Sequence, residues 1–208
     1  MLDLQRCIND HQDTWLVASF RTVANRFVQE ATLGCPVCSA KYSIEHGVAD
    51  FTRGESVPAC EEERAHASHR REELATRAGA YLDATEPGAT IALGGLWAFA
   101  AGDLSQMADV RVLALNATSE VEETERVGLL RVAAGIPVAP ASLMGIALDA
   151  WFPKKIIDSA VRAVRPGGRI VGPTNIPTPT DLHVLARDEH YWVAQKPVEV
   201  VTLRRASQ

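Results

Sequence analysis

The sequence has little of what several functional classes require. It carries 21 basic against 26 acidic residues, a net charge of −5, so no excess of positive charge is available to neutralise a nucleic-acid backbone. No apolar run approaches the roughly 18 residues that a transmembrane helix needs, and the first ten residues lack the apolar segment of a secretory signal. Four cysteines in 208 residues are too few for a disulfide scaffold. These absences predict a protein with no nucleic-acid partner that is cytoplasmic, or attached peripherally to the cytoplasmic face of a membrane complex.

Local signatures of common enzymes are also missing. The sequence has no G-x-S-x-G nucleophile elbow, no phosphate-binding P-loop and no H-E-x-x-H metal motif. The polar triplet Asp188-Glu189-His190 stands between two short strand-like runs, which predicts an exposed hairpin turn. Evidence on function therefore has to come from the pattern of the whole chain.

Composition divides the chain into three parts. Residues 1–52 hold a Cys-x-x-Cys pair and a cluster of aromatic side chains. Residues 53–60 are rich in turn formers, which is typical of a linker, and end on a further thiol, Cys60. In residues 61–208 helical and strand patterns alternate. Such alternation predicts an α/β domain with a mostly parallel sheet.

Apolar spacing gives the order of elements in this last part. Three segments have the spacing of helices: residues 61–86, 97–109 and 154–164. Four apolar runs have the length of buried strands: residues 89–95, 110–115, 143–151 and 169–171. We expect a brief edge strand at 128–132 and at most a short acidic helix at 120–126. The runs 182–188 and 190–196 predict an antiparallel hairpin.

One stretch in this part points to a fold family. Residues 160–173, AVRAVRPGGRIVGP, resemble the class I S-adenosylmethionine-dependent methyltransferases, in which a helix ends in a Pro-Gly-Gly-like turn before strand five. Proline and glycine cannot continue a helix, and glycine accepts a left-handed cap. Residues 136–152 are similar to the family's segment that leads into strand four. The resemblance covers about residues 61–197 and implies a Rossmann-like sheet that ends in an antiparallel C-terminal hairpin.

The residues at the family's cofactor positions depart from its pattern. The glycine loop after the first strand keeps Gly94 and Gly95, whose family counterparts let the backbone approach the methionine part of the cofactor. Leu96 and Trp97 follow at once, and we expect the large indole to fill the cofactor space. The acid that binds the ribose hydroxyls after the second strand is replaced by Asn116, which lacks the charge that strengthens such hydrogen bonds.

After the fourth strand stand one carboxylate and two aromatics, Asp149, Trp151 and Phe152. Together with Leu96 and Trp97, these bulky side chains pack a solid core where a pocket used to be, or they line a remodelled pocket for another small molecule. The first interpretation predicts no use of S-adenosylmethionine and a non-catalytic accessory, structural or assembly subunit, which acts by protein–protein contacts in a larger complex. One alternative is a binder of another small molecule. The other is a methyltransferase whose atypical cofactor site consists of four residues: Gly94, Gly95, Asn116 and Asp149.

Residues 1–52 contain the most recognisable short stretch. Cys35-Pro36-Val37-Cys38 is followed by Tyr42-Ser43-Ile44 and by a segment ending in Asp50-Phe51. This order resembles the zinc-ribbon domain of the tRNA-methyltransferase activator family, which is often fused in front of bacterial methyltransferases. The resemblance implies a small β-rich module with strands near 14–19 and 26–33. Because that family works by docking onto partners, it also implies another protein as the partner.

A structural zinc ion needs four tetrahedral ligands, usually two pairs. Cys35 and Cys38 supply one pair, but the family's second Cys-x-x-Cys is absent. The resemblance leaves Cys7 with His11, or with Asp10, to complete the site. A ribbon that has lost its metal and is held by its aromatic side chains is the alternative. A redox role for the Cys-x-x-Cys pair is disfavoured, because such pairs lie at a strand-to-helix turn.

Overall fold

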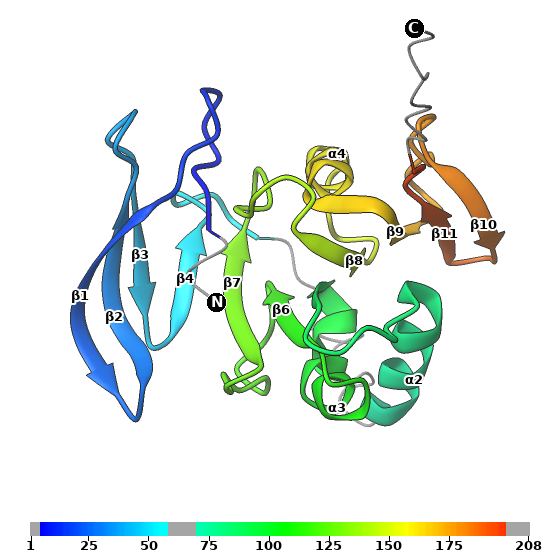
Figure 1. Ribbon diagram of the computed structural model, residues 1–208, viewed down its shortest axis with the longest axis horizontal. Helices are drawn as coiled ribbons and strands as arrows, with labels where there is room; N and C mark the ends of the chain where they lie inside the picture. The colour runs from blue at the N-terminus through cyan, green and yellow to red at the C-terminus, as the bar shows by residue number, and fades with distance from the viewer. Residues whose placement is uncertain (1–4, 58–69, 199–208) are drawn as a thin grey trace, which may run out of the picture.

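One mixed sheet of eleven strands organises the part of the protein that the structure describes (Figure 1). The computed structural model describes residues 5–57 and 70–198. Its strands lie in the order β1-β2-β3-β4-β7-β6-β5-β8-β9-β11-β10. The non-consecutive neighbours in the second half of this order show that the chain crosses over the sheet, as expected of a parallel α/β arrangement.

The centre of the sheet is parallel. Five strands form it: β7 (Val127–Val132), β6 (Arg111–Leu115), β5 (Thr90–Gly94), β8 (Leu143–Ala147) and β9 (Val164–Pro173). Every residue of β5 and β8 is buried, which is typical of strands covered on both faces. This centre agrees with the mostly parallel α/β sheet that the alternating pattern predicts.

Helices cover both faces of this centre (Figure 1). The described helices are α2 (Arg71–Leu82), the 3₁₀ segment η2 (Gly95–Ala100), α3 (Ala101–Met107) and α4 (Lys154–Ala163). Successive side chains of a strand point to opposite faces. Accordingly Ile91 and Leu93 pack in the cluster with α2 and α3, whereas Ala92 packs in the cluster with α4. None of the described helices has the length and apolar character needed to cross a bilayer.

An antiparallel hairpin ends the sheet on one side. β10 (His183–Arg187) pairs with β11 (Tyr191–Gln195), and β11 pairs with β9, both antiparallel. At the tip the Asp188 carboxylate accepts the backbone amides of His190 and Tyr191, each at 2.7 Å. The backbone amide of Tyr191, followed by that of His190, lowers the pKa of Asp188. The predicted hairpin and its exposed polar turn are confirmed.

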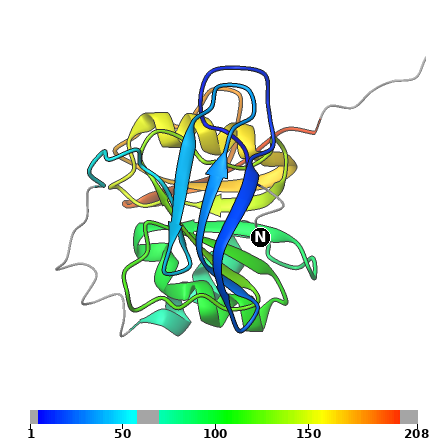
Figure 2. The same ribbon diagram turned by 90° about the vertical axis from the view of Figure 1, so that its left-hand side faces the viewer.

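The N-terminal strands extend the same sheet on the other side. They are β1 (Val17–Ala24), β2 (Phe27–Gly34), β3 (Lys41–Glu45) and β4 (Val48–Phe51), each antiparallel to the next. Figure 2 views the molecule from their side. β4 pairs in parallel with β7, and Phe51 lies opposite Val132. The prediction of an edge strand at 128–132 is therefore wrong, because the N-terminal residues cover that edge.

The hydrophobic core is continuous across this junction. One cluster of buried side chains contains Tyr42 and Phe51 from the N-terminal strands, Leu113 from β6 and Ile156 from α4. The N-terminal part therefore shares its core with the α/β part.

Three local predictions differ from the structure. α4 ends at Ala163, and the Pro-Gly-Gly sequence lies inside β9, not in a turn before it. Gly167 has a positive φ of 80°, and a side chain on Gly168 would collide with the backbone of Met144, so both glycines serve an irregularity in the β8–β9 register. Residues 120–126 form turns without a helix. The first strand begins at Val17 instead of Thr14. Of the predicted helix 61–86, residues 61–69 lie outside the described residues.

We expect the two parts of the sheet to unfold together. Phe51 is fully buried, and its ring centroid lies 4.6 Å from that of Tyr42. Phe51→Ala should lower the free energy of unfolding by about 3–5 kcal/mol, the usual cost of such a truncation. Urea denaturation followed by circular dichroism and tryptophan fluorescence should give one coincident transition. Two separate transitions, with only one moved by the substitution, would contradict the shared core.

Candidate functional site

Four potential metal ligands meet at one end of the N-terminal strands. Cys7 and His11 precede β1, whereas Cys35 and Cys38 lie in the turn between β2 and β3. Their ligand atoms all lie within 4.8 Å of one another. Cys7 Sγ is 3.6 Å from Cys38 Sγ, and His11 Nε2 is 3.4 Å from Cys35 Sγ. The structure thus brings together the four residues named from the sequence.

The sequence left His11 or Asp10 to complete the cluster with Cys7, and it offered Cys60 as a further thiol. The group of ligand atoms found among the described residues includes His11 and does not include Asp10. Cys60 lies outside the described residues.

The ring of His11 is oriented for coordination. Its Nδ1 lies 2.7 Å from the backbone carbonyl oxygen of Gln12. Because a carbonyl only accepts hydrogen bonds, Nδ1 carries the proton and Nε2 presents a lone pair toward Cys35. This hydrogen bond also raises the pKa of His11. A second ring nitrogen bonded to a carbonyl is the usual support of a metal-binding histidine.

The thiols differ in their readiness to ionise. Hydrogen bonds from the backbone of Ala40 and then from the side chain of Asn9 lower the pKa of Cys38 to about 6. Burial raises the pKa of Cys7, although Tyr42 Oη lies 3.4 Å from its sulfur. Metal binding requires thiolates, and Cys38 supplies one at neutral pH. Three sulfurs and one imidazole nitrogen at these separations fit the tetrahedral shell of structural zinc.

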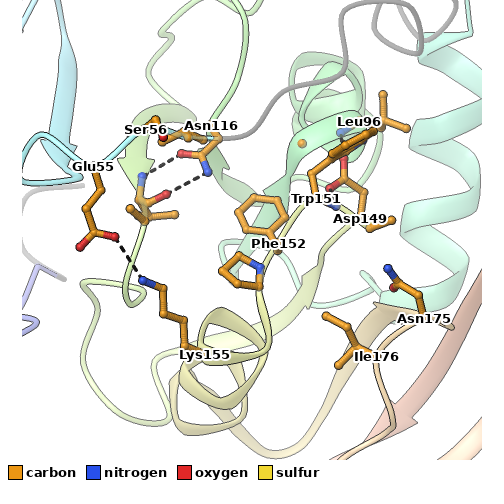
Figure 3. Close-up of a pocket in the computed structure, with 16 residues that line it drawn as sticks. Glu55, Ser56, Leu96, Asn116, Asp149, Trp151, Phe152, Lys155, Asn175 and Ile176 are labelled. Carbon is orange, nitrogen blue, oxygen red and sulfur yellow. Dashed lines mark hydrogen bonds and ion pairs between the residues drawn. The ribbon is translucent and has the colours of Figure 1, made fainter.

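A cavity of about 470 Å³ lies at the carboxyl ends of the parallel strands (Figure 3). Its walls follow β5, β6, β7 and β8 and include the segments 55–57 and 175–176. Ligands of open α/β sheets bind at this edge. All four residues of the atypical cofactor site, Gly94, Gly95, Asn116 and Asp149, stand at or beside this cavity, and the last three line it.

Asp149 covers the turn after β5 with its own carboxylate. Oδ2 accepts the backbone amide of Leu96 at 2.7 Å, and Oδ1 accepts that of Trp151 at 3.1 Å. Gly95 has a positive φ of 63°, and a side chain on it would overlap the Asp149 carboxylate. Glycine is thus required here by the protein's own acid. The bare backbone that the family offers to a cofactor is in contact with a side chain.

Asn116 is likewise engaged within the protein. It follows β6, and its Nδ2 donates to the carbonyl oxygen of Val132 at 3.0 Å. Its Oδ1 accepts the amide of Val132 at 2.8 Å, and Figure 3 shows both bonds. The Asn116 amide therefore forms the same pair of hydrogen bonds with Val132 that a backbone amide in a neighbouring strand would form. These two bonds join the end of β6 to the end of β7.

The aromatic residues near the cavity have separate roles. Trp97 is 1% exposed and packs edge-on against Tyr191, with ring centroids 5.0 Å apart, in the cluster with α2 and α3. The cavity is lined by its neighbour Leu96, and the indole packs in the core beside α2 and α3, so the expectation that it fills the cofactor space stays a prediction. Phe152 is buried, and its ring lies 2.7 Å from the position that a Cβ of Gly94 would take. Trp97 and Phe152 are thus buried, as the solid-core interpretation expects, whereas Trp151 is 39% exposed and lines the cavity, as a remodelled pocket would require.

One cavity contact was not predicted from the sequence. Glu55, in the segment that follows β4, forms an ion pair with Lys155 at the start of α4, with 3.2 Å between Oε2 and Nζ (Figure 3). The pair joins residues 100 positions apart, and no local pattern identifies it. It holds the linker segment against one wall of the cavity.

Comparison with known proteins gives support at the level of fold. No protein-family model matches the sequence, and no curated protein matches it. Among solved structures, the 4+2 cyclase SpnF matches with a TM-score of 0.50 and 10% identity, over 70% of this chain and 86% of that one. The fold is methyltransferase-like.

Two further solved structures are similar. A Methanococcus maripaludis S-adenosylmethionine-dependent methyltransferase matches with a TM-score of 0.47 and 12% identity, over 72% of this chain and 100% of that one. A complex of the Haloferax volcanii Trm112 methyltransferase activator with a methyltransferase matches with a TM-score of 0.45 and 18% identity, over 55% of this chain and 57% of that one. The chain thus spans little more than half the length of the Haloferax structure.

The thiol environments predict selective alkylation of the metal-free protein. Iodoacetamide should modify Cys38 at neutral pH, with a rate that rises through a midpoint near the pKa of about 6. Cys7 should react far more slowly, since burial raises its pKa and shields its sulfur. Peptide mapping by mass spectrometry over a pH series measures both rates. Equal rates for the two thiols would show that this description of the cluster is wrong.

Proposed function

We propose that the protein is a non-catalytic accessory or structural subunit built on a methyltransferase-like fold. The observation that supports this most is the position of Asp149, whose carboxylate contacts Gly95 and accepts the amide of Leu96. In the resembling family this turn faces the methionine end of the cofactor, which carries a carboxylate. The same end also carries an ammonium group, which a carboxylate attracts, so what opposes the cofactor is occupancy. The Asp149 side chain already fills the space over Gly95 and holds the Leu96 amide.

The ribose position supports the same proposal. Asn116 uses both ends of its amide on the backbone of Val132. A ribose would have to compete with this pairing, and it would meet a neutral amide where the family offers a charged acceptor. Neutral hydrogen bonds are roughly half as strong as charge-assisted ones.

The exposed edge of the N-terminal strands suits contact with a partner protein. β1 is an edge strand of the sheet, and three of its apolar side chains are more than half exposed: Val17, Phe20 and Val23. An exposed edge with apolar side chains suits the addition of a strand from a partner. The opposite edge of the N-terminal strands is already paired with β7. A partner protein would therefore dock on β1.

Zinc belongs to this proposal as a structural element. Cys7, His11, Cys35 and Cys38 would hold it and so join the N-terminal segment to the β2–β3 turn. The described cysteines are free thiols, which suits a reducing compartment such as the cytoplasm.

A second candidate is a small-molecule binder. The cavity of about 470 Å³ favours it, because ligand pockets commonly measure about 300–1,000 Å³ and are lined by aromatic side chains such as Trp151. Native mass spectrometry of the protein from its own host would reveal a ligand that co-purifies. A bound molecule that is not S-adenosylmethionine would favour this candidate over the first.

The zinc content of the purified protein tests the proposed metal site. Elemental analysis of protein purified without chelators should give close to one zinc per chain, the content of a single four-ligand site. Cys35→Ser should lose it and melt at a lower temperature, while Asp10→Asn should keep it. Metal-free wild-type protein with an unchanged melting temperature would contradict a structural role.

The binding of S-adenosylmethionine tests the proposed loss of the cofactor site. Isothermal titration with S-adenosylmethionine up to about 1 mM should give no binding heat. A Kd weaker than about 1 mM corresponds to a binding free energy smaller in magnitude than about 4 kcal/mol. Asp149→Ala removes the competing carboxylate, and weak binding by this variant alone would identify the acid as the obstacle. Micromolar binding by the wild-type protein that disappears in Gly95→Trp would establish the methyltransferase alternative instead.

A further inference from the structure

One ligand sulfur has a side-chain hydrogen-bond donor supplied from elsewhere in the chain. Asn9 Nδ2 lies 3.1 Å from Cys38 Sγ, and Arg53 Nη1 lies 2.8 Å from Asn9 Oδ1. Asn9 stands between the ligands Cys7 and His11, whereas Arg53 follows β4. Three separate segments thus form a hydrogen-bonded chain that ends on a ligand sulfur.

The donor-to-acceptor direction of these two hydrogen bonds follows from Arg53. A guanidinium group donates hydrogen bonds and never accepts them. The Asn9 atom that faces Arg53 is therefore the amide oxygen, so the amide nitrogen faces Cys38 as a donor. Arg53 in this way fixes which end of the Asn9 amide meets the sulfur.

The sulfur of Cys38 gains from Asn9 a side-chain donor in addition to the backbone amide of Ala40. Three thiolates and one neutral imidazole around a divalent zinc ion leave a net charge of −1 on the centre. Cys7 is buried and has the Tyr42 hydroxyl beside its sulfur, whereas Cys38 is exposed. A hydrogen bond to an ionised acceptor is stronger than a neutral one and offsets part of its charge.

We propose that Asn9 and Arg53 are positioning residues of the metal centre: the Asn9 amide donates to the Cys38 thiolate, and Arg53 holds that amide in its donating orientation. This inference rests on the zinc site proposed above. Residues that support the ligands in this way commonly change metal affinity by 10- to 100-fold when they are replaced. A merely structural Asn9 would leave the electronic state of the sulfur unchanged.

Cobalt(II) provides the test, because its absorption spectrum reports both tetrahedral geometry and the sulfur-to-metal charge transfer. Affinity is measured by competition with a chromophoric chelator. Asn9→Ala should weaken cobalt binding about tenfold or more and shift the charge-transfer band to lower energy, since the thiolate loses a hydrogen bond. Asn9→Asp should weaken it further, because a carboxylate would face the thiolate.

Arg53 and a matched control complete the design. Arg53→Ala should cause a smaller loss of affinity than Asn9→Ala and almost none in the Asn9→Ala background, because Arg53 acts through the amide. Asp10→Asn, a change at a neighbouring exposed position, should match the wild-type affinity and spectrum.

The outcomes separate this inference from the site on which it rests. If wild-type protein binds no tetrahedral cobalt, the metal site itself is wrong and the inference falls with it. If wild-type protein binds cobalt and Asn9→Ala keeps both the affinity and the band, the metal site stands and the positioning role is overturned. If the losses of cobalt affinity in Asn9→Ala and Arg53→Ala are fully additive in the double variant, Arg53 does not act through the Asn9 amide.

Discussion

The Asp149 carboxylate holds together the turn on which the rest of the cavity depends. It accepts one backbone amide after β5 and another after β8, so it joins the carboxyl ends of the two central strands. Backbone amides at the start of a helical segment attract negative charge, and here the protein supplies that charge itself. In a methyltransferase-like fold the same turn is the place for a cofactor. In the function proposed above, the internal hydrogen bonds that stabilise this edge would also oppose the binding of a cofactor there.

The pairing of β4 with β7 has a comparable consequence for the whole molecule. It joins an N-terminal four-stranded unit and an α/β unit into one sheet, and one of the two core clusters spans both units. The metal-ligand cluster lies in the same N-terminal part, and its residue Cys7 belongs to that core. In addition, Gln5 bridges to Val138, so the segment that carries Cys7 contacts the α/β unit directly. A metal held there would stabilise the N-terminal strands and their contact with the rest together.

The sequence predicted those features that local patterns encode. Apolar spacing gave the order of helices and strands, and the Cys-x-x-Cys pair with Cys7 and His11 gave the four clustered ligands. It missed the β4–β7 pairing, because contacts between residues about 80 positions apart leave no local trace. It also missed the hydrogen bond from the Leu96 amide to the Asp149 carboxylate, because these residues lie 53 positions apart.

In the proposed non-catalytic protein, its own side chains satisfy the backbone groups that a cofactor would use. An amide NMR titration with S-adenosylmethionine examines those groups individually. We expect the signals of Leu96, Val132 and Trp151 to stay in place up to the highest ligand concentration, because their hydrogen bonds to Asp149 and Asn116 persist. Concerted shifts of these three signals, with the rest of the sheet unchanged, would contradict this expectation.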